Sequence, residues 1–110
     1  MNFIPVNTPL ITNQDAKSVF ETVKSGWISS SGKNIKLFEN NLSKFVNRKY
    51  GCAVSNGTAA LEIAVKSLDL KKNDEIIIPT FTIISTANSI IKNNLKPVLV
   101  DSDLSTWNIK

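Results

Sequence analysis

The residues of this chain whose types and spacing best suit chemistry are Ser55-Asn56-Gly57-Thr58-Ala59, where a strand-like run leads into a helical pattern. Amide groups at a helix N-terminus have no partner within the helix, and the helix dipole favours an anion there. Gly57 permits close backbone approach, so the amides of Thr58 and Ala59, with the Thr58 hydroxyl, could hold a phosphate. The pattern alone favours an ordinary N-cap, in which Asn56 or Ser55 accepts a hydrogen bond from one amide.

Other common catalytic and nucleotide-binding sites are excluded by what the sequence lacks. It contains neither Gly-x-Gly-x-x-Gly nor Gly-x-x-x-x-Gly-Lys-Ser/Thr, which disfavours a dinucleotide-binding domain and an ATP site. It has no histidine and one cysteine, Cys52, so it cannot build a His-based triad, the usual zinc sites or an internal disulfide.

The charge pattern argues against nucleic-acid binding. The chain has 110 residues, 42% of them hydrophobic, and a net charge of +4, which fits one small globular domain. The basic residues are twelve lysines and Arg48, and they are spread along the chain instead of forming a stripe. The aromatic residues fall mostly at apolar-periodic positions, as Phe20, Phe38 and Phe45 do, and we expect them to be core residues.

No membrane-associated segment is expected. Residues 1–5 lack the basic and apolar regions of a secretory leader, and the longest internal apolar run is Ile76-Ile77-Ile78. We therefore expect a soluble, cytoplasmic protein that binds neither membranes nor nucleic acid.

Two helices and a loop are predicted in the first half of the chain. Residues 1–11 read as an extended arm, and a helix over 15–24 is capped by Thr12 or Asn13 and ended by Gly26. A Ser/Gly-rich loop follows at 26–32. A second amphipathic helix over 33–47 is expected, with apolar residues on one face.

From residue 50 the pattern is βαβαβ. The β-prone runs are residues 50–55, 75–78 and 97–100, and the helical patterns are 57–69 and about 83–94. Strands that are apolar at every position are typical of a parallel sheet covered on both faces, which gives an α/β fold. Because such sheets bind ligands at the carboxyl ends of their strands, we expect three loops to meet there, at residues 55–57, at 79–82 and at Asp101.

Four ordered motifs give the chain a family resemblance: 26–32 (GWISSSG), 55–61 (SNGTAAL), 79–82 (PTFT) and 97–101 (PVLVD). Together they resemble the DegT-type sugar aminotransferases, pyridoxal-phosphate enzymes of fold type I, especially those that aminate a nucleotide-linked 4-keto-6-deoxyhexose. The resemblance implies the N-terminal part of the large domain, a three-layer α/β/α structure with a mostly parallel sheet. Residues 1–110 would be one incomplete domain, with an arm, helix and loop at 1–32 and the first part of the cofactor-binding domain at 33–110.

The resemblance also implies cofactor contacts. It places the cofactor phosphate on the segment already described as a possible cradle. Position 83, where many family members carry an aromatic ring against the pyridine ring, holds an isoleucine that can pack there but cannot π-stack. Phe81 could supply a ring instead, or belong to the core. The implied cofactor-binding residues are Asn56, Gly57, Thr58, Ala59 and Ile83.

For the substrate, the resemblance implies a role for the loop at 26–32, which would border a nucleotide-sugar and the second subunit of a homodimer. The candidate contacts are Trp27, Ser29 and Ser30. A Ser/Gly-rich turn with Trp27 anchoring the helix end is the structural alternative. Glutamate would be the amino donor.

The residues that carry out the chemistry in the family, a cofactor-binding lysine and an acidic residue, come later than position 110. We expect no catalytic residue here and no activity from these residues alone. The lysines near the expected site, at 66, 71, 72, 92 and 96, fall on polar faces or turns, and Asp101 suits a capping or turn role. An uncovered sheet edge predicts poor solubility. The alternative function is a non-catalytic α/β module that binds a phosphate ligand or pairs with another subunit.

Overall fold

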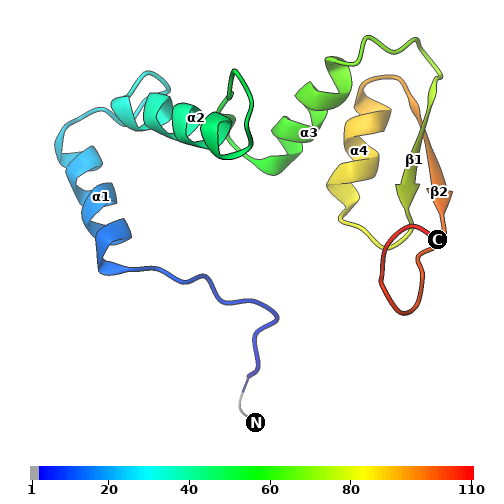
Figure 1. Ribbon diagram of the computed structural model, residues 1–110, viewed down its shortest axis with the longest axis horizontal. Helices are drawn as coiled ribbons and strands as arrows, with labels where there is room; N and C mark the ends of the chain where they lie inside the picture. The colour runs from blue at the N-terminus through cyan, green and yellow to red at the C-terminus, as the bar shows by residue number, and fades with distance from the viewer. Residues whose placement is uncertain (1–2) are drawn as a thin grey trace. The chain divides into compact units, whose positions relative to one another are not determined.

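The computed structural model describes residues 3–110 and contains four helices and two strands in the order α1, α2, α3, β1, α4, β2 (Figure 1). The chain divides after Ala53 into two units, residues 1–53 and 54–110. Among the described residues, no helix is both long enough and apolar enough to cross a membrane.

Helix α1, Asn13–Lys24, begins at the N-cap that the sequence predicted. The hydroxyl of Thr12 accepts a hydrogen bond from the Asp15 amide, while the Asp15 carboxylate accepts one from the Thr12 amide, forming a capping box. Ser25 is the C-cap, and Gly26 follows with a φ of +75°, a conformation that favours glycine. Helix α2, Lys33–Phe45, ends two residues earlier than expected.

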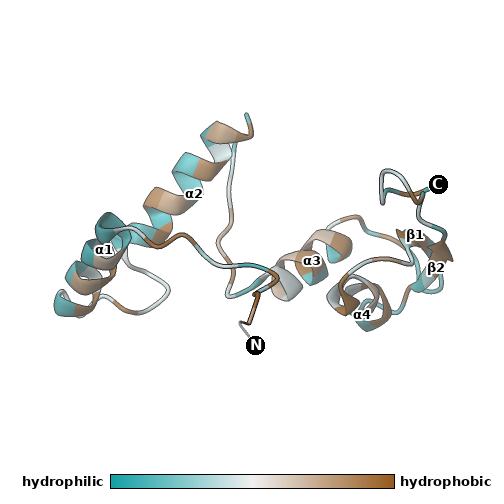
Figure 2. Ribbon diagram, turned by 90° about the horizontal axis from the view of Figure 1, so that it is seen from below, coloured by the Kyte–Doolittle hydropathy of each residue, from teal (hydrophilic) through white to brown (hydrophobic). Residues whose placement is uncertain are grey.

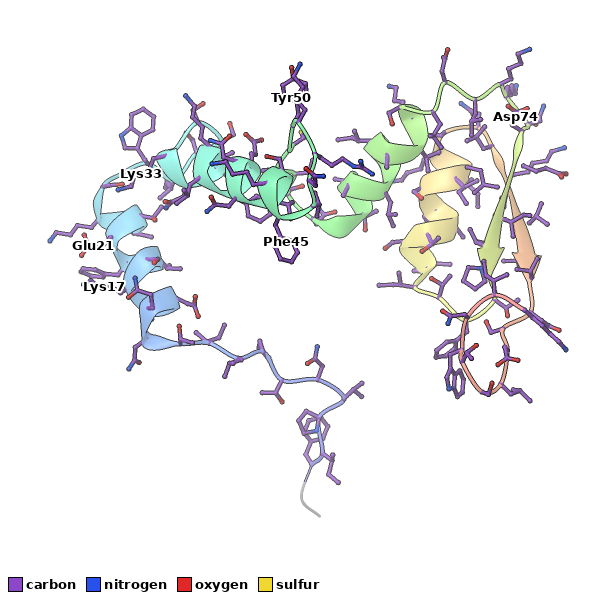
Figure 3. All side chains as sticks on the ribbon, viewed as in Figure 1. Lys17, Glu21, Lys33, Phe45, Tyr50 and Asp74 are labelled. Carbon is purple, nitrogen blue, oxygen red and sulfur yellow. The ribbon has the colours of Figure 1, made fainter. Side chains whose placement is uncertain are left out.

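The apolar faces of α1 and α2 are not buried, so the prediction that Phe20, Phe38 and Phe45 are core residues is wrong. All three are exposed, and Phe45 is 89% accessible to solvent and projects away from α2 (Figure 3). Within the described part of these two helices, Ser43 is the one buried residue. Helical periodicity correctly gave the amphipathic pattern, and Figure 2 shows teal and brown segments alternating along both helices. Burial needs a packing partner, and the described residues of this unit do not supply one.

The predicted strand at residues 50–55 is also wrong, because this segment carries no regular secondary structure. The backbone of residues 51–53 packs against α2 instead. The Ala53 amide donates to the Glu39 carboxylate at 2.8 Å, and a Cβ added to Gly51 would lie 2.5 Å from the Glu39 carbonyl oxygen. A β-prone run becomes a strand only when a neighbouring backbone pairs with it, and residues 3–110 supply none here.

The second unit contains a βαβ arrangement, one strand fewer than the predicted βαβαβ. Strand β1, Glu75–Pro79, pairs in parallel with β2, Lys96–Val100, from Glu75 opposite Lys96 to Pro79 opposite Val100. Helix α4, Ile84–Lys92, connects them, and helix α3, Gly57–Lys66, precedes β1. Helix α4 packs against both strands and α3 packs against α4, so α4 lies between α3 and the sheet (Figure 1).

The core of this unit is small and lies between α4 and the sheet. Ile78, Ile90 and Leu95 are buried, and three partly buried residues pack around them: Val65, Ile76 and Ala87. Ile77 points to the other side of β1, because side chains alternate along a strand, and it is 61% exposed. Helices on both faces of the sheet, as predicted for a three-layer structure, are therefore not present within residues 3–110.

Candidate functional site

The site described here lies at one end of the second unit, where the carboxyl ends of both strands and the N-termini of α3 and α4 meet (Figure 1). The parallel ladder extends one step past β1, because the Thr80 amide donates to the Val100 carbonyl at 2.9 Å. The loops that follow the strands therefore start side by side, as the sequence predicted for residues 79–82 and Asp101.

The N-terminus of α3 combines the two alternatives that the sequence left open. Asn56, not Ser55, is the N-cap, and its side-chain oxygen accepts a hydrogen bond from the Ala59 amide at 2.9 Å. The Ala59 amide is therefore engaged within the chain. Gly57 and Thr58, the first two residues of the helix, have no acceptor for their amides within it.

Gly57 leaves the start of α3 open. Its φ is not positive, and a Cβ added there would meet no atom of the described residues within 4 Å. Neither backbone strain nor packing within this unit therefore requires glycine. An open backbone with two outward amides at the positive end of a helix dipole suits the phosphate group of a ligand.

The two helix N-termini are joined by their side chains. The Thr58 hydroxyl donates to the Ser85 hydroxyl at 2.9 Å, although the two residues are 27 positions apart in sequence. Each is the second residue of its helix, and both are partly buried. The sequence analysis missed Ser85, because no spacing rule connects a residue of α4 with one of α3.

Ile83 is the N-cap residue of α4 and makes no side-chain capping hydrogen bond. It is 69% exposed, so its side chain is not part of the core of this unit. Phe81 was the alternative candidate for ring contact with the cofactor. Its ring packs against that of Trp107 instead, with centroids 5.1 Å apart.

Trp107 is held in place by a turn after β2. The Asp103 carboxylate accepts hydrogen bonds from the amides of Ser105 and Thr106 and from both their hydroxyls, and Trp107 donates its amide to the Asp103 carbonyl. These bonds, led by that from the Ser105 hydroxyl, lower the pKa of Asp103 to about 2. Asp103 is therefore an ionised turn residue and is unsuited to act as a base near neutral pH.

The candidate substrate loop belongs to the first unit. Trp27 lines a pocket of about 370 Å³ together with residues of α1, α2 and the loop: Thr22, Ser25, Ser31, Lys33, Asn34 and Lys36. Figure 3 labels Lys33, which lies at the start of α2. The Ser29 carbonyl accepts a hydrogen bond from the Gly32 amide, which closes the loop, and neither Ser29 nor Ser30 lines this pocket. Lys33 and Lys36 were not predicted from the sequence, although Lys33 follows the loop directly and Lys36 lies in the first turn of α2.

The lysines near the site are solvent-exposed. The five lysines that the sequence placed on polar faces or in turns are all exposed, and one of them, Lys92, forms an ion pair with Glu62. Among residues 3–110, no group of three or more cysteine, aspartate or glutamate side chains could hold a metal ion.

Comparison with known proteins extends these observations. Residues 9–110 match the DegT/DnrJ/EryC1/StrS aminotransferase family. The chain is 41% identical over 107 residues to a GDP-perosamine synthase of Escherichia coli O157:H7, covering 97% of this chain and 29% of that protein. It is 40% identical over 108 residues to the spore coat polysaccharide biosynthesis protein SpsC of Bacillus subtilis, covering 98% of this chain and 28% of that protein.

The fold agrees with these relatives. An E. coli GDP-4-keto-6-deoxy-D-mannose-3-dehydratase, solved with bound hydrated PLP, superposes with a TM-score of 0.85 at 27% identity. The match covers 96% of this chain and 28% of that one. The chain thus spans less than a third of the length of the proteins it matches.

Proposed function

This chain belongs to the DegT/DnrJ/EryC1/StrS aminotransferase family, and we propose that it is part of a pyridoxal-phosphate-dependent enzyme that aminates a nucleotide-linked keto-deoxysugar. Glutamate is the proposed amino donor. The proposal rests on the α3 N-terminus, whose open Gly57 and outward amides suit a phosphate, in a chain 41% identical to a GDP-perosamine synthase.

In this proposal the second unit binds the cofactor. The amides of Gly57 and Thr58 hold the phosphate, and the Thr58 hydroxyl lies beside it. Asn56 and Ala59 shape this cradle, because the hydrogen bond between them fixes the first turn of α3. The exposed Ile83 packs against the ring by apolar contact. When bound, the cofactor supplies an electron sink for the transfer of the amino group.

The first unit contributes to the sugar site. We assign substrate contacts to Trp27, Ser29 and Ser30, and the placement of Trp27 at a pocket with polar and basic residues supports the first of these. Residues 33–110 form the first part of the cofactor-binding large domain, preceded by the arm, helix and loop of residues 1–32. The intact enzyme is a homodimer in which this loop borders the partner subunit.

The test is an assay of the intact polypeptide that carries these residues, purified with pyridoxal phosphate. It is mixed with L-glutamate and a nucleotide-linked 4-keto-6-deoxyhexose, and the products are identified by mass spectrometry. The expected result is equal amounts of 2-oxoglutarate and amino sugar, and loss of both when glutamate is omitted. Binding of the cofactor without any amino sugar would instead favour the non-catalytic, phosphate-binding module.

A further inference from the structure

We propose that Ser85 is a direct phosphate ligand, and that its hydroxyl and that of Thr58 act as one unit. This inference rests on the proposed function, because it extends the phosphate cradle from α3 to α4. Its basis is the hydrogen bond that the Thr58 hydroxyl donates to Ser85 at 2.9 Å. That bond places the hydroxyl of Ser85 beside Thr58, whose amide the proposed function assigns to the phosphate.

The role of Ser85 follows from how many hydroxyl hydrogens this pair of side chains can donate. A hydroxyl has one hydrogen to donate and can also accept. Since the Thr58 hydrogen is used on Ser85, the hydrogen of Ser85 is the one that the pair can offer to an outside acceptor. A phosphate oxygen is such an acceptor, and a hydrogen bond to a charged group is stronger than one between neutral groups.

Ser85 differs from other serines of these helices. The hydroxyl of Ser67 donates to the Ala64 carbonyl at 2.7 Å, and that of Ser89 donates to the Thr86 carbonyl at 2.8 Å. Both satisfy their hydrogen on the preceding turn of their own helix, a common local bond. Within the described residues, Ser85 makes no such bond and accepts from another helix instead.

The packing of the second unit keeps the pair together. Helix α3 packs along α4, and the side chain of Asn93, the C-cap of α4, donates to the Glu62 carbonyl in the middle of α3 at 3.2 Å. Thr58 and Ser85 both lie in the first turn of their helices, so a group held at the amides of α3 also lies near the start of α4. Within the described residues, the N-cap Ile83 makes no side-chain capping bond, and of the first three amides of α4 that of Thr86 donates to the Ile83 carbonyl, which leaves those of Ile84 and Ser85 open.

The experiment compares two ligands that differ only in the phosphate. Dissociation constants of pyridoxal phosphate and pyridoxal are measured by absorbance for the intact polypeptide and for Ser85→Ala, Thr58→Val and the double variant. The dissociation constant of pyridoxal divided by that of pyridoxal phosphate gives the contribution of the phosphate group to affinity. Ser85→Ala should reduce this ratio about tenfold, as expected for one lost hydrogen bond to a charged group. The double variant should lose less than the product of the single losses, because the hydroxyls act together.

Matched variants separate this role from a folding defect. Ser67→Ala removes a hydroxyl from the other end of α3 and should leave the ratio unchanged, and Ser85→Thr should preserve it because a hydroxyl remains. If the wild type prefers pyridoxal phosphate and Ser85→Ala keeps the full preference, the assignment of Ser85 is wrong while the phosphate site stands. If the wild type shows no preference, the phosphate site and the proposed function fail together.

Discussion

The indole ring of Trp107 packs against the ring of Phe81, with centroids 5.1 Å apart and planes inclined by 49°. The pair joins the turn after β2 to the loop after β1, at the end of the sheet where the candidate site lies. The aromatic pair therefore connects residues 80–83 with residues 102–109, which share few backbone hydrogen bonds.

Trp107→Ala is expected to loosen both loops, because a tilted aromatic pair contributes about 0.5–1.5 kcal/mol beyond the area it buries. Amide hydrogen exchange, measured by mass spectrometry on the intact polypeptide, should become faster in residues 80–83 and 102–109. Trp27→Ala, in the first unit, is the control and should leave both segments unchanged. Unaltered exchange in Trp107→Ala would show that the turn hydrogen bonds suffice.

Asn56→Ala removes the N-cap of α3 and should destabilise its first turn by about 1 kcal/mol. The Ala59 amide loses its 2.9 Å partner and should exchange about fivefold faster. Asn56→Asp keeps an acceptor and should retain protection. Asn41→Ala, at an exposed position inside α2, is the matched control, and faster exchange of Ala59 in that variant would argue against a specific cap.

Gly57→Ala separates binding from folding. A Cβ at this position meets no atom of the described residues, so the free energy of unfolding should be unchanged or raised by up to about 1 kcal/mol. Affinity for pyridoxal phosphate should fall at least about tenfold, because the methyl group blocks close approach to the backbone amides. Equal affinity in the variant and the wild type would remove Gly57 from the proposed cradle.

Gly51→Ala should instead lower stability and leave cofactor binding unchanged. Its Cβ would lie 2.5 Å from the Glu39 carbonyl oxygen, so the segment must move away from α2 at a cost of about 1–3 kcal/mol. Urea unfolding should show the loss of stability. The dissociation constant of pyridoxal divided by that of pyridoxal phosphate should stay equal to the wild-type value. A stable Gly51→Ala variant would mean that residues 50–53 are not fixed against α2.

The turn at Asp103 should make stability depend on acid pH. Its pKa is lowered from 3.8 to about 2 by hydrogen bonds that the ionised carboxylate accepts. The contribution is therefore fully present above about pH 4 and is lost as the pH falls toward 2. Asp103→Asn should flatten the pH dependence of urea unfolding in that window. Identical pH profiles for wild type and Asp103→Asn would contradict this account.

Local features of this protein were determined by the sequence itself. Thr12 and Asn56 cap helices where their side chains can reach an amide three residues ahead, and the parallel pairing of residues 75–79 with 96–100 follows from a strand, helix, strand pattern. These features depend on residues close in sequence or on a connection that permits one arrangement. Four ordered motifs likewise gave the family that residues 9–110 match.

Only the tertiary structure decided which of these elements found partners. Residues 50–55 have a strand-forming pattern, but Gly51 and Ala53 pack against Glu39, and Phe38 lies on an apolar helical face yet stays exposed. The Thr58–Ser85 and Phe81–Trp107 contacts join residues 27 and 26 positions apart. Periodicity and capping act within one or two turns, whereas strand pairing, burial and side-chain contacts between elements depend on which distant surface is present to receive them.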